Sequence, residues 1–275
     1  MKTLIVPVDF SPAALNAANY ALDFAHAVNA SITLLYVCQV PVAVSEAPVA
    51  AVTMKEILED AEKKISELRE ELIRKSGGKL KVYTQIKEGY ITTQIESYCK
   101  LANPYAVVMG SSGNGAVERI LFGSTTLSAI RSLSWPLIIV PRGAKFKNIS
   151  KVGLACDLKN VIEAVHAEEI KKLLIDFKPE LHILHVNTET EKKISDTEIE
   201  GSEGVRDMFI ELKPQFHFLN KQHIEEAVNE FAEKNNLDML IVIPKKHGLL
   251  ETIFHRSEAK HIALHAHVPL LSIHE

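Results

Sequence analysis

The sequence predicts an α/β protein in which two similar halves each carry a parallel sheet covered by helices on both faces. In the first half, apolar runs of strand length alternate with longer helical stretches. Near-continuous apolar strands that alternate with helices are typical of a parallel sheet buried on both faces. Strands are expected at 3–9, 31–38, 80–87, 105–110 and 137–141, and helices at 12–29, 53–76, 90–102 and 123–133.

An internal repeat is the second observation behind this fold class. Three segments recur in the same order, at offsets of 148, 149 and 133 residues. Three ordered matches indicate a duplication, and they predict domains at 1–142 and 150–275 joined by a basic linker. The matched segments are Leu4–Asp9 with Val152–Asp157, Thr33–Val37 with His182–Val186, and Trp135–Val140 with Val268–Ile273.

The second half repeats the alternation of the first. Strands are expected at 151–157, 180–187, 214–219, 238–243 and 269–273, and helices at 159–176, 198–211, 222–235 and 253–266.

Composition excludes several classes of function. The chain has 275 residues, 47% of them hydrophobic, and a net charge of −4 with acids and bases interspersed. This pattern argues against a nucleic-acid or anionic-membrane surface, which needs clustered Lys and Arg. Even the longest basic clusters, such as Lys145-Phe146-Lys147, are short. No apolar run approaches the length of a membrane span. Three scattered cysteines predict free thiols, so we expect a cytoplasmic protein.

A glycine-framed segment lies between the fourth strand and the following helix. Glycines at 110, 113 and 123 frame it, and Ser124 and Thr125 follow the last one. Glycine lets a backbone approach an anion closely, and the amides at a helix start point toward it. The segment therefore predicts a phosphate-binding site.

Two familiar phosphate motifs do not fit this segment. The Walker loop requires a lysine before the hydroxyl residue, and none stands there. The dinucleotide fingerprint follows the first strand with GxGxxG spacing. Here the glycines follow the fourth strand with GxxG spacing.

The spacing G-x2-G-x9-G-[ST] instead resembles the ATP-binding branch of the universal stress protein family. The resemblance covers residues 1–142 and includes the strand ends Pro7–Ser11 and Leu34–Val37 and the segment Trp135–Val140. It implies an adenine-nucleotide alpha-hydrolase-like sheet in the order 3-2-1-4-5, with a crevice between the first and fourth strands. The implied ligand is ATP with Mg.

The resemblance also implies which residues bind the nucleotide. Asp9 and Val37 are expected at the adenine and ribose end. The other expected binding residues, most of them around the triphosphate, are Met109, Gly110, Ser111, Gly113, Gly123, Ser124 and Thr125.

Several of these residues have a second interpretation. Asp9 could cap the helix that follows, a role that Ser11 could equally fill. Ser111 and Ser112 could donate to phosphates or only satisfy the turn. No general base or lysine clamp for phosphoryl transfer is identifiable, so binding is favoured over turnover and no catalytic residue is assigned. A slow ATPase is the enzymatic alternative.

The second half lacks the glycine loop. In our alignment, Pro244 takes the place of Gly110, and His255 and Arg256 stand at Gly123 and Ser124. A proline has no amide to donate, so this half is not expected to bind ATP in the same way.

Histidines are frequent near the end of the chain. His261 and His265 are spaced i, i+4, which makes them weak candidates for a metal site. A mixture of surface and packed histidines is the other interpretation. An adaptor that binds a metal or a small ligand through this half is therefore a further alternative.

The family resemblance also bears on assembly. Members commonly pair through their fifth strands, so Leu137–Val140 and Leu270–Ile273 are expected to meet within one chain as a pseudo-dimer. The expected role is a nucleotide-occupied stress-response signalling module. The sequence leaves open which stress or partner it serves, and whether two chains form a homodimer.

Overall fold

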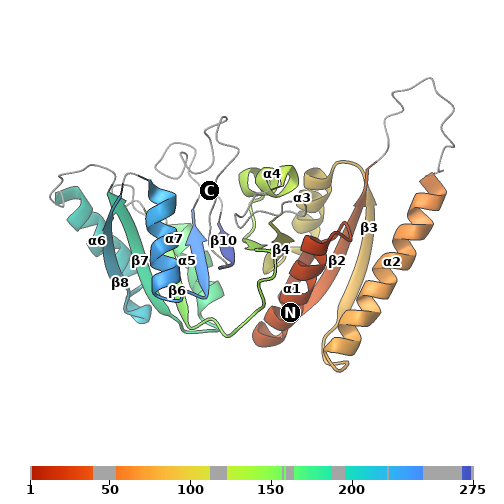
Figure 1. Ribbon diagram of the computed structural model, residues 1–275, viewed down its shortest axis with the longest axis horizontal. Helices are drawn as coiled ribbons and strands as arrows, with labels where there is room; N and C mark the ends of the chain where they lie inside the picture. Colours follow the sequence, from red (N-terminus) through yellow and green to blue (C-terminus); the bar gives the residue numbers. More distant parts are fainter. Residues whose placement is uncertain are drawn as a thin grey trace, which may run out of the picture.

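The described residues of the first half form five strands and four helices in strict alternation (Figure 1). The computed structural model describes residues 2–39, 54–111, 123–156, 158, 164–187, 196–221, 223–243 and 268–273. The elements of the first half are β1 (Lys2–Pro7), α1 (Pro12–Val28), β2 (Ala30–Cys38), α2 (Met54–Lys75), β3 (Val82–Glu88), α3 (Ile91–Ala102), β4 (Ala106–Gly110), α4 (Ser124–Ser132) and β5 (Leu137–Val140).

The second half repeats this order. Its elements are β6 (Lys151–Ala155), α5 (Ala164–Leu174), β7 (Glu180–Asn187), α6 (Asp196–Met208), the 3-10 helix η1 (Ile210–Leu212), β8 (Gln215–Asn220), α7 (Ile224–Lys234), β9 (Met239–Val242) and β10 (Leu270–Ser272). The helix expected at 253–266 lies outside the described residues.

The strand order confirms the predicted topology and shows that the two expected sheets are joined. The first half runs β3-β2-β1-β4-β5, and the second half continues as β10-β9-β6-β7-β8. Two five-stranded sheets whose fifth strands meet were expected, and the ten strands within the described ranges form one continuous sheet. β5 and β10 pair antiparallel, with Leu270 opposite Ile139 and Leu271 opposite Ile138. The other strand pairs are parallel. This pairing removes two sheet edges that would otherwise stay open.

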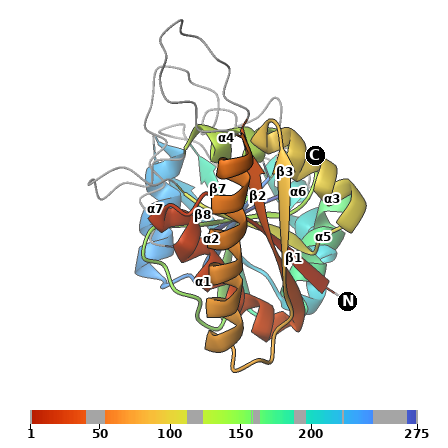
Figure 2. The ribbon, with the colours of Figure 1, turned by 90° about the vertical axis from the view of Figure 1, so that its right-hand side faces the viewer.

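Each face of the sheet carries its own core because the strands are apolar on both sides. In β1, Leu4 and Val6 belong to one buried cluster and Ile5 to the other. The first cluster is covered by α1, α2, α5 and α6, and the second by α3, α4 and α7. Figure 2 shows α1 and α2 on one side of β2 and β3, and α3 on the other.

The two halves share backbone details as well as strand order. The amide of Val8 donates to the Leu35 carbonyl at 2.9 Å, and the amide of Cys156 donates to the Leu184 carbonyl at 3.0 Å. Both bonds continue a strand pair beyond its last residue, at positions that the repeat makes equivalent.

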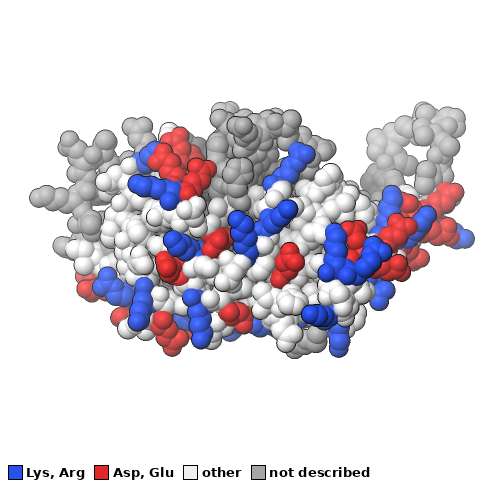
Figure 3. Space-filling model, turned by 60° about the horizontal axis from the view of Figure 1, so that its bottom comes forward, with Lys and Arg blue, Asp and Glu red and all other residues white. Residues whose placement is uncertain are grey.

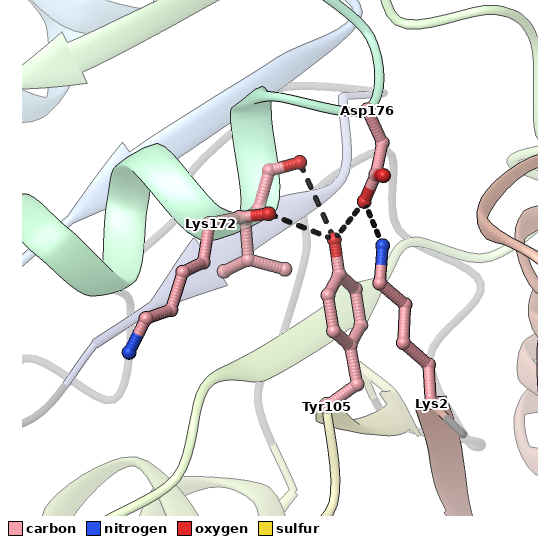
Figure 4. Close-up of polar contacts among 5 residues, drawn as sticks. Lys2, Tyr105, Lys172 and Asp176 are labelled. Carbon is pink, nitrogen blue, oxygen red and sulfur yellow. Dashed lines mark hydrogen bonds and ion pairs between the residues drawn. The ribbon is translucent and has the colours of Figure 1, made fainter.

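An aromatic and polar contact joins the halves on the side of α1. Phe24 packs against Phe146 and Phe177 with ring centroids 5.6 Å away in each case. Beside them, the Tyr105 hydroxyl donates to Asp176 Oδ2 at 2.8 Å, and Lys2 Nζ pairs with the same carboxylate (Figure 4). Burial, and then Asp176, raise the pKa of Tyr105 above its ordinary value. The hydroxyl therefore stays a donor at neutral pH.

No helix within the described ranges is both long and apolar enough to cross a membrane.

Candidate functional site

A hollow of about 200 Å³ opens at the carboxyl ends of β1 and β4, where the strand order reverses direction. Open α/β sheets bind their ligands at such a position. The residues that line it are Pro7, Val8, Asp9, Ser11, Ala13, Ala14, Leu35, Val37, Ile91, Met109, Gly110, Gly123, Ser124, Thr125 and Thr126.

The turn after β1 places the Asp9 carboxylate at the rim of this hollow. Ser11 caps α1, because its Oγ accepts from the Ala14 amide at 3.3 Å, and Pro12 follows at the first helical position. Asp9 Oδ1 accepts from the Ser11 amide at 3.0 Å and does not cap the helix. Phe10 between them has a φ of 61° and stacks on Tyr36 at 5.3 Å. Ser11, and not Asp9, is therefore the helix cap. The Asp9 side chain is exposed and lines the hollow.

Gly110 is a glycine because α1 crosses the end of β4 at very short range. A Cβ at this position would lie 2.6 Å from the Ala13 carbonyl oxygen, a distance that real Cβ atoms do not show. The sequence suggested that this glycine serves close approach to an anion. The structure gives it a packing reason that holds with or without a ligand.

The start of α4 presents backbone donors to the hollow. Gly123 occupies the N-cap position with an extended backbone, and as a glycine it has no side chain with which to cap the helix. Its own amide donates to the Ser111 carbonyl at 2.9 Å, and Thr126 Oγ1 donates to the Gly110 carbonyl at 3.1 Å. These two bonds fix α4 to the end of β4. Uncapped first-turn amides are a ready site for an anion.

The opposite wall of the hollow is apolar. Leu35 and Val37 come from β2, Met109 from β4 and Ile91 from the first turn of α3. Ile91 and Thr126 were not expected from the sequence. The sequence did contain a signal for Ile91. This residue directly follows the Gly89-Tyr90 turn and starts a helix on the carboxyl side of the sheet, where ligands are bound.

Most of the predicted binding residues lie together in this hollow. Ser111 is 3% exposed and does not line it; its amide donates to the Val140 carbonyl at 3.0 Å. Gly113 lies outside the described residues, as do Ser112, His261 and His265. Predicted residues that do line the hollow are Asp9, Val37, Met109, Gly110, Gly123, Ser124 and Thr125.

The strand register corrects the alignment of the second half. Ile5 pairs with Val107 in β4, and Gly153, its equivalent in the repeat, pairs with Leu240 in β9. Counting on from these pairs, Ile243 stands where the first half has Gly110, and Pro244 is one residue further on. Ile243 is 3% exposed. A large buried side chain therefore replaces the glycine on which α1 packs.

Within the part of the chain that the structure describes, no three His, Cys, Asp or Glu side chains gather as metal ligands. The described lining of the hollow contains one ionisable side chain, that of Asp9.

Fold and site together define an open α/β protein with a crevice at the point in its first half where the strand order reverses. The chain belongs to the universal stress protein family, whose pattern matches residues 1–141. A universal stress protein of Methanocaldococcus jannaschii is 27% identical over 149 residues, which are 52% of this chain and 84% of that protein.

Solved structures extend the likeness of fold to the whole chain. A universal stress protein of Archaeoglobus fulgidus superimposes with a TM-score of 0.71 at 18% identity, over 99% of this chain and 96% of that one. A putative universal stress protein of Pseudomonas aeruginosa gives 0.60 at 13% identity, over 100% and 93%.

Proposed function

We propose that the first half binds ATP in the hollow between β1 and β4, and that the protein acts as a nucleotide-occupied stress-response module of the cytoplasm. The observation that carries the proposal is the start of α4 in the hollow, where the N-cap residue is a glycine, together with an apolar wall. The helix amides would hold the phosphates, and Leu35 and Val37 would contact the adenine.

We further propose that the chain is a tandem of two domains, 1–142 and 150–275, of which the first alone binds ATP in this manner. The pairing of β5 with β10 gives the tandem the form of an intrachain pseudo-dimer. Ile243 in place of a glycine supports a degenerate second site.

The residues that line the hollow favour ATP binding without fast hydrolysis. Among the lining residues, which all belong to the described part of the chain, no lysine, arginine or histidine can clamp a γ-phosphate. Asp9 can accept from a ribose hydroxyl or bind Mg²⁺ beside the phosphates. At most, slow hydrolysis is expected.

The proposal is tested by calorimetry of the full chain with ATP and Mg²⁺, using a matched pair of variants at Gly123. The φ of −64° at Gly123 is open to any residue. Asp and Asn are both good N-caps, so Gly123→Asp and Gly123→Asn should keep the fold or stabilise it slightly. Only the aspartate adds a negative charge where the phosphates would lie.

We expect Gly123→Asp to weaken ATP binding about a hundredfold, and Gly123→Asn to weaken it far less, since a charge-assisted contact is worth about 1.5–3 kcal/mol. Equal affinity in both variants would remove the phosphate role of α4. No ATP binding by the unmodified chain would remove the proposal itself.

A further inference from the structure

A second cavity, of about 380 Å³, lies between the two halves, away from the hollow at β1 and β4. It is bounded by the segment that links the halves, by α1 and by two segments of the second half. Its lining residues are Tyr20, Arg142, Gly143, Ala144, Lys145, Lys147, Leu237, Asp238, Val268 and Pro269. We call it the linker groove.

Three cations line the linker groove. Arg142, Lys145 and Lys147 are exposed, and within the described ranges no carboxylate forms an ion pair with any of them. Figure 3 shows the underside of the molecule, with Lys and Arg side chains in the middle of this face and Asp and Glu side chains among them. Unpaired cations that converge on a hollow are a binding surface for anions.

The linker that carries these cations is fixed in place. Asn16 Nδ2 donates to the Pro141 carbonyl at 3.0 Å and to the Ala144 carbonyl at 3.3 Å, so α1 holds the turn. Gly143 has the positive φ of 74° that this turn requires. Phe146 packs on Tyr20 and Phe24 at 5.5 and 5.6 Å. The linker is therefore anchored at Pro141, Ala144 and Phe146, each next to one of the cations.

Charged and aromatic side chains alternate along the linker, so that the charged ones line the groove and the aromatic one packs in the core. Phe146 is packed inward among aromatic rings, while Lys145 and Lys147 on either side of it line the groove. The sequence shows this only as a short basic cluster, Lys145-Phe146-Lys147.

The rest of the lining of the linker groove is partly apolar and partly polar. Leu237, Val268 and Pro269 are apolar. Burial, and then the charge of Asp238, raise the pKa of Tyr20 above its ordinary value, so that its hydroxyl stays a donor. Asp238 is the one carboxylate in the lining, and its Oδ2 accepts from the amides of Ser150 and Lys151 at 2.8 and 2.9 Å. These bonds occupy that oxygen, and with three cations against one carboxylate the lining keeps a net positive charge.

We propose that the linker groove binds a small phosphorylated molecule, with the phosphate held by Arg142, Lys145 and Lys147. The uncharged part of the ligand would lie against Leu237, Val268 and Pro269. Because the lining comes from both halves, the bound molecule would contact the linker, α1 and the second half at once. This site is independent of the ATP site proposed for the first half.

The test uses inorganic pyrophosphate as the probe, titrated into the full chain in a phosphate-free buffer of low ionic strength. The groove variant carries Arg142→Gln, Lys145→Gln and Lys147→Gln. A matched control carries Arg74→Gln, Lys79→Gln and Lys81→Gln, which removes the same charge from exposed positions outside both cavities. All six side chains are exposed, so both variants should fold, which a urea denaturation curve checks.

We expect pyrophosphate to bind the unmodified chain and the control variant alike, and to bind the groove variant at least about tenfold more weakly. Tyr20→Phe should weaken binding by a smaller factor. ATP affinity should be the same in the groove variant as in the unmodified chain.

Three results would overturn the proposal. The first is no binding of pyrophosphate by the unmodified chain. The second is an equal loss in the groove and control variants, since that reports net charge alone. The third is binding that Gly123→Asp abolishes and the groove variant keeps, which would assign the probe to the first-half hollow.

Discussion

The ends of β4 and β9 are equivalent in the repeat, yet they are built for different purposes. Gly110 ends β4 so closely under α1 that a Cβ would strike the Ala13 backbone. At the same register, Ile243 follows β9 and is buried. In the first half, the absence of a side chain at Gly110 lets the start of α1 pack directly on the end of β4. In the second half, the Ile243 side chain occupies the equivalent position. Equivalent strand ends of one duplicated fold thus differ by the volume of a single side chain.

Exchanging these two residues gives the largest expected effect. Gly110→Ile should destabilise the protein by about 3 kcal/mol or more, because the side chain meets backbone atoms that cannot move aside without shifting α1. It should also abolish ATP binding. Urea denaturation followed by circular dichroism measures the first effect, and calorimetry the second.

The reciprocal variant, Ile243→Gly, is the control for this exchange. It should cost about 3–5 kcal/mol through the cavity it leaves and the added backbone freedom, without creating an ATP site. If Gly110→Ile were as stable as the unmodified chain, the packing reason for Gly110 would be wrong.

The contact between the halves gives an effect of intermediate size. Tyr105→Phe removes the hydroxyl that donates to Asp176 at 2.8 Å and leaves the aromatic ring in place. We expect a loss of about 1–2 kcal/mol, because the acceptor of this hydrogen bond is charged.

A double-mutant cycle with Asp176→Asn separates this bond from other effects of the two changes. A coupling free energy near zero would mean that Tyr105 and Asp176 contribute independently to the stability of the protein.

The sequence predicts backbone features of this protein better than its side-chain pairs. Apolar runs such as Leu4–Val6 mark strands because burial on both faces demands them, and the repeat locates their counterparts. The switch point places Asp9 beside Gly110 from topology alone. The packing reason for Gly110 could not be predicted, because it depends on the distance between the backbone of α1 at Ala13 and the end of β4. Nor could the contact of Tyr105 with Asp176, which lie 71 residues apart.

The smallest expected effect concerns a histidine pair that only the second half carries. His182 Nδ1 and His217 Nε2 lie 3.0 Å apart on β7 and β8, packed against Phe231 of α7. By the repeat and the strand register, the first half has Thr33 and Gln85 at these positions. The histidines thus place two titratable rings where the first half has none.

Acidification should therefore act on the second half through this pair. Burial lowers the pKa of both rings; Glu180 opposes this at His182, and Lys151 adds to it. At His217 the neighbouring ring lowers the pKa further. Because the unfolded chain then takes up protons more readily than the folded one, this contribution to stability is full above pH 6.5 and declines below it.

The measurement is the urea midpoint at pH 7.5 and at pH 5.5. A chain carrying His182→Thr and His217→Gln, the residues of the first half, should lose less stability on acidification than the unmodified chain. His26→Gln, a change at an exposed histidine of α1, should leave the decline as it is. If the double variant declined as steeply as the unmodified chain, the buried pair would not be the source, and the difference between the two halves would have no consequence for their response to pH.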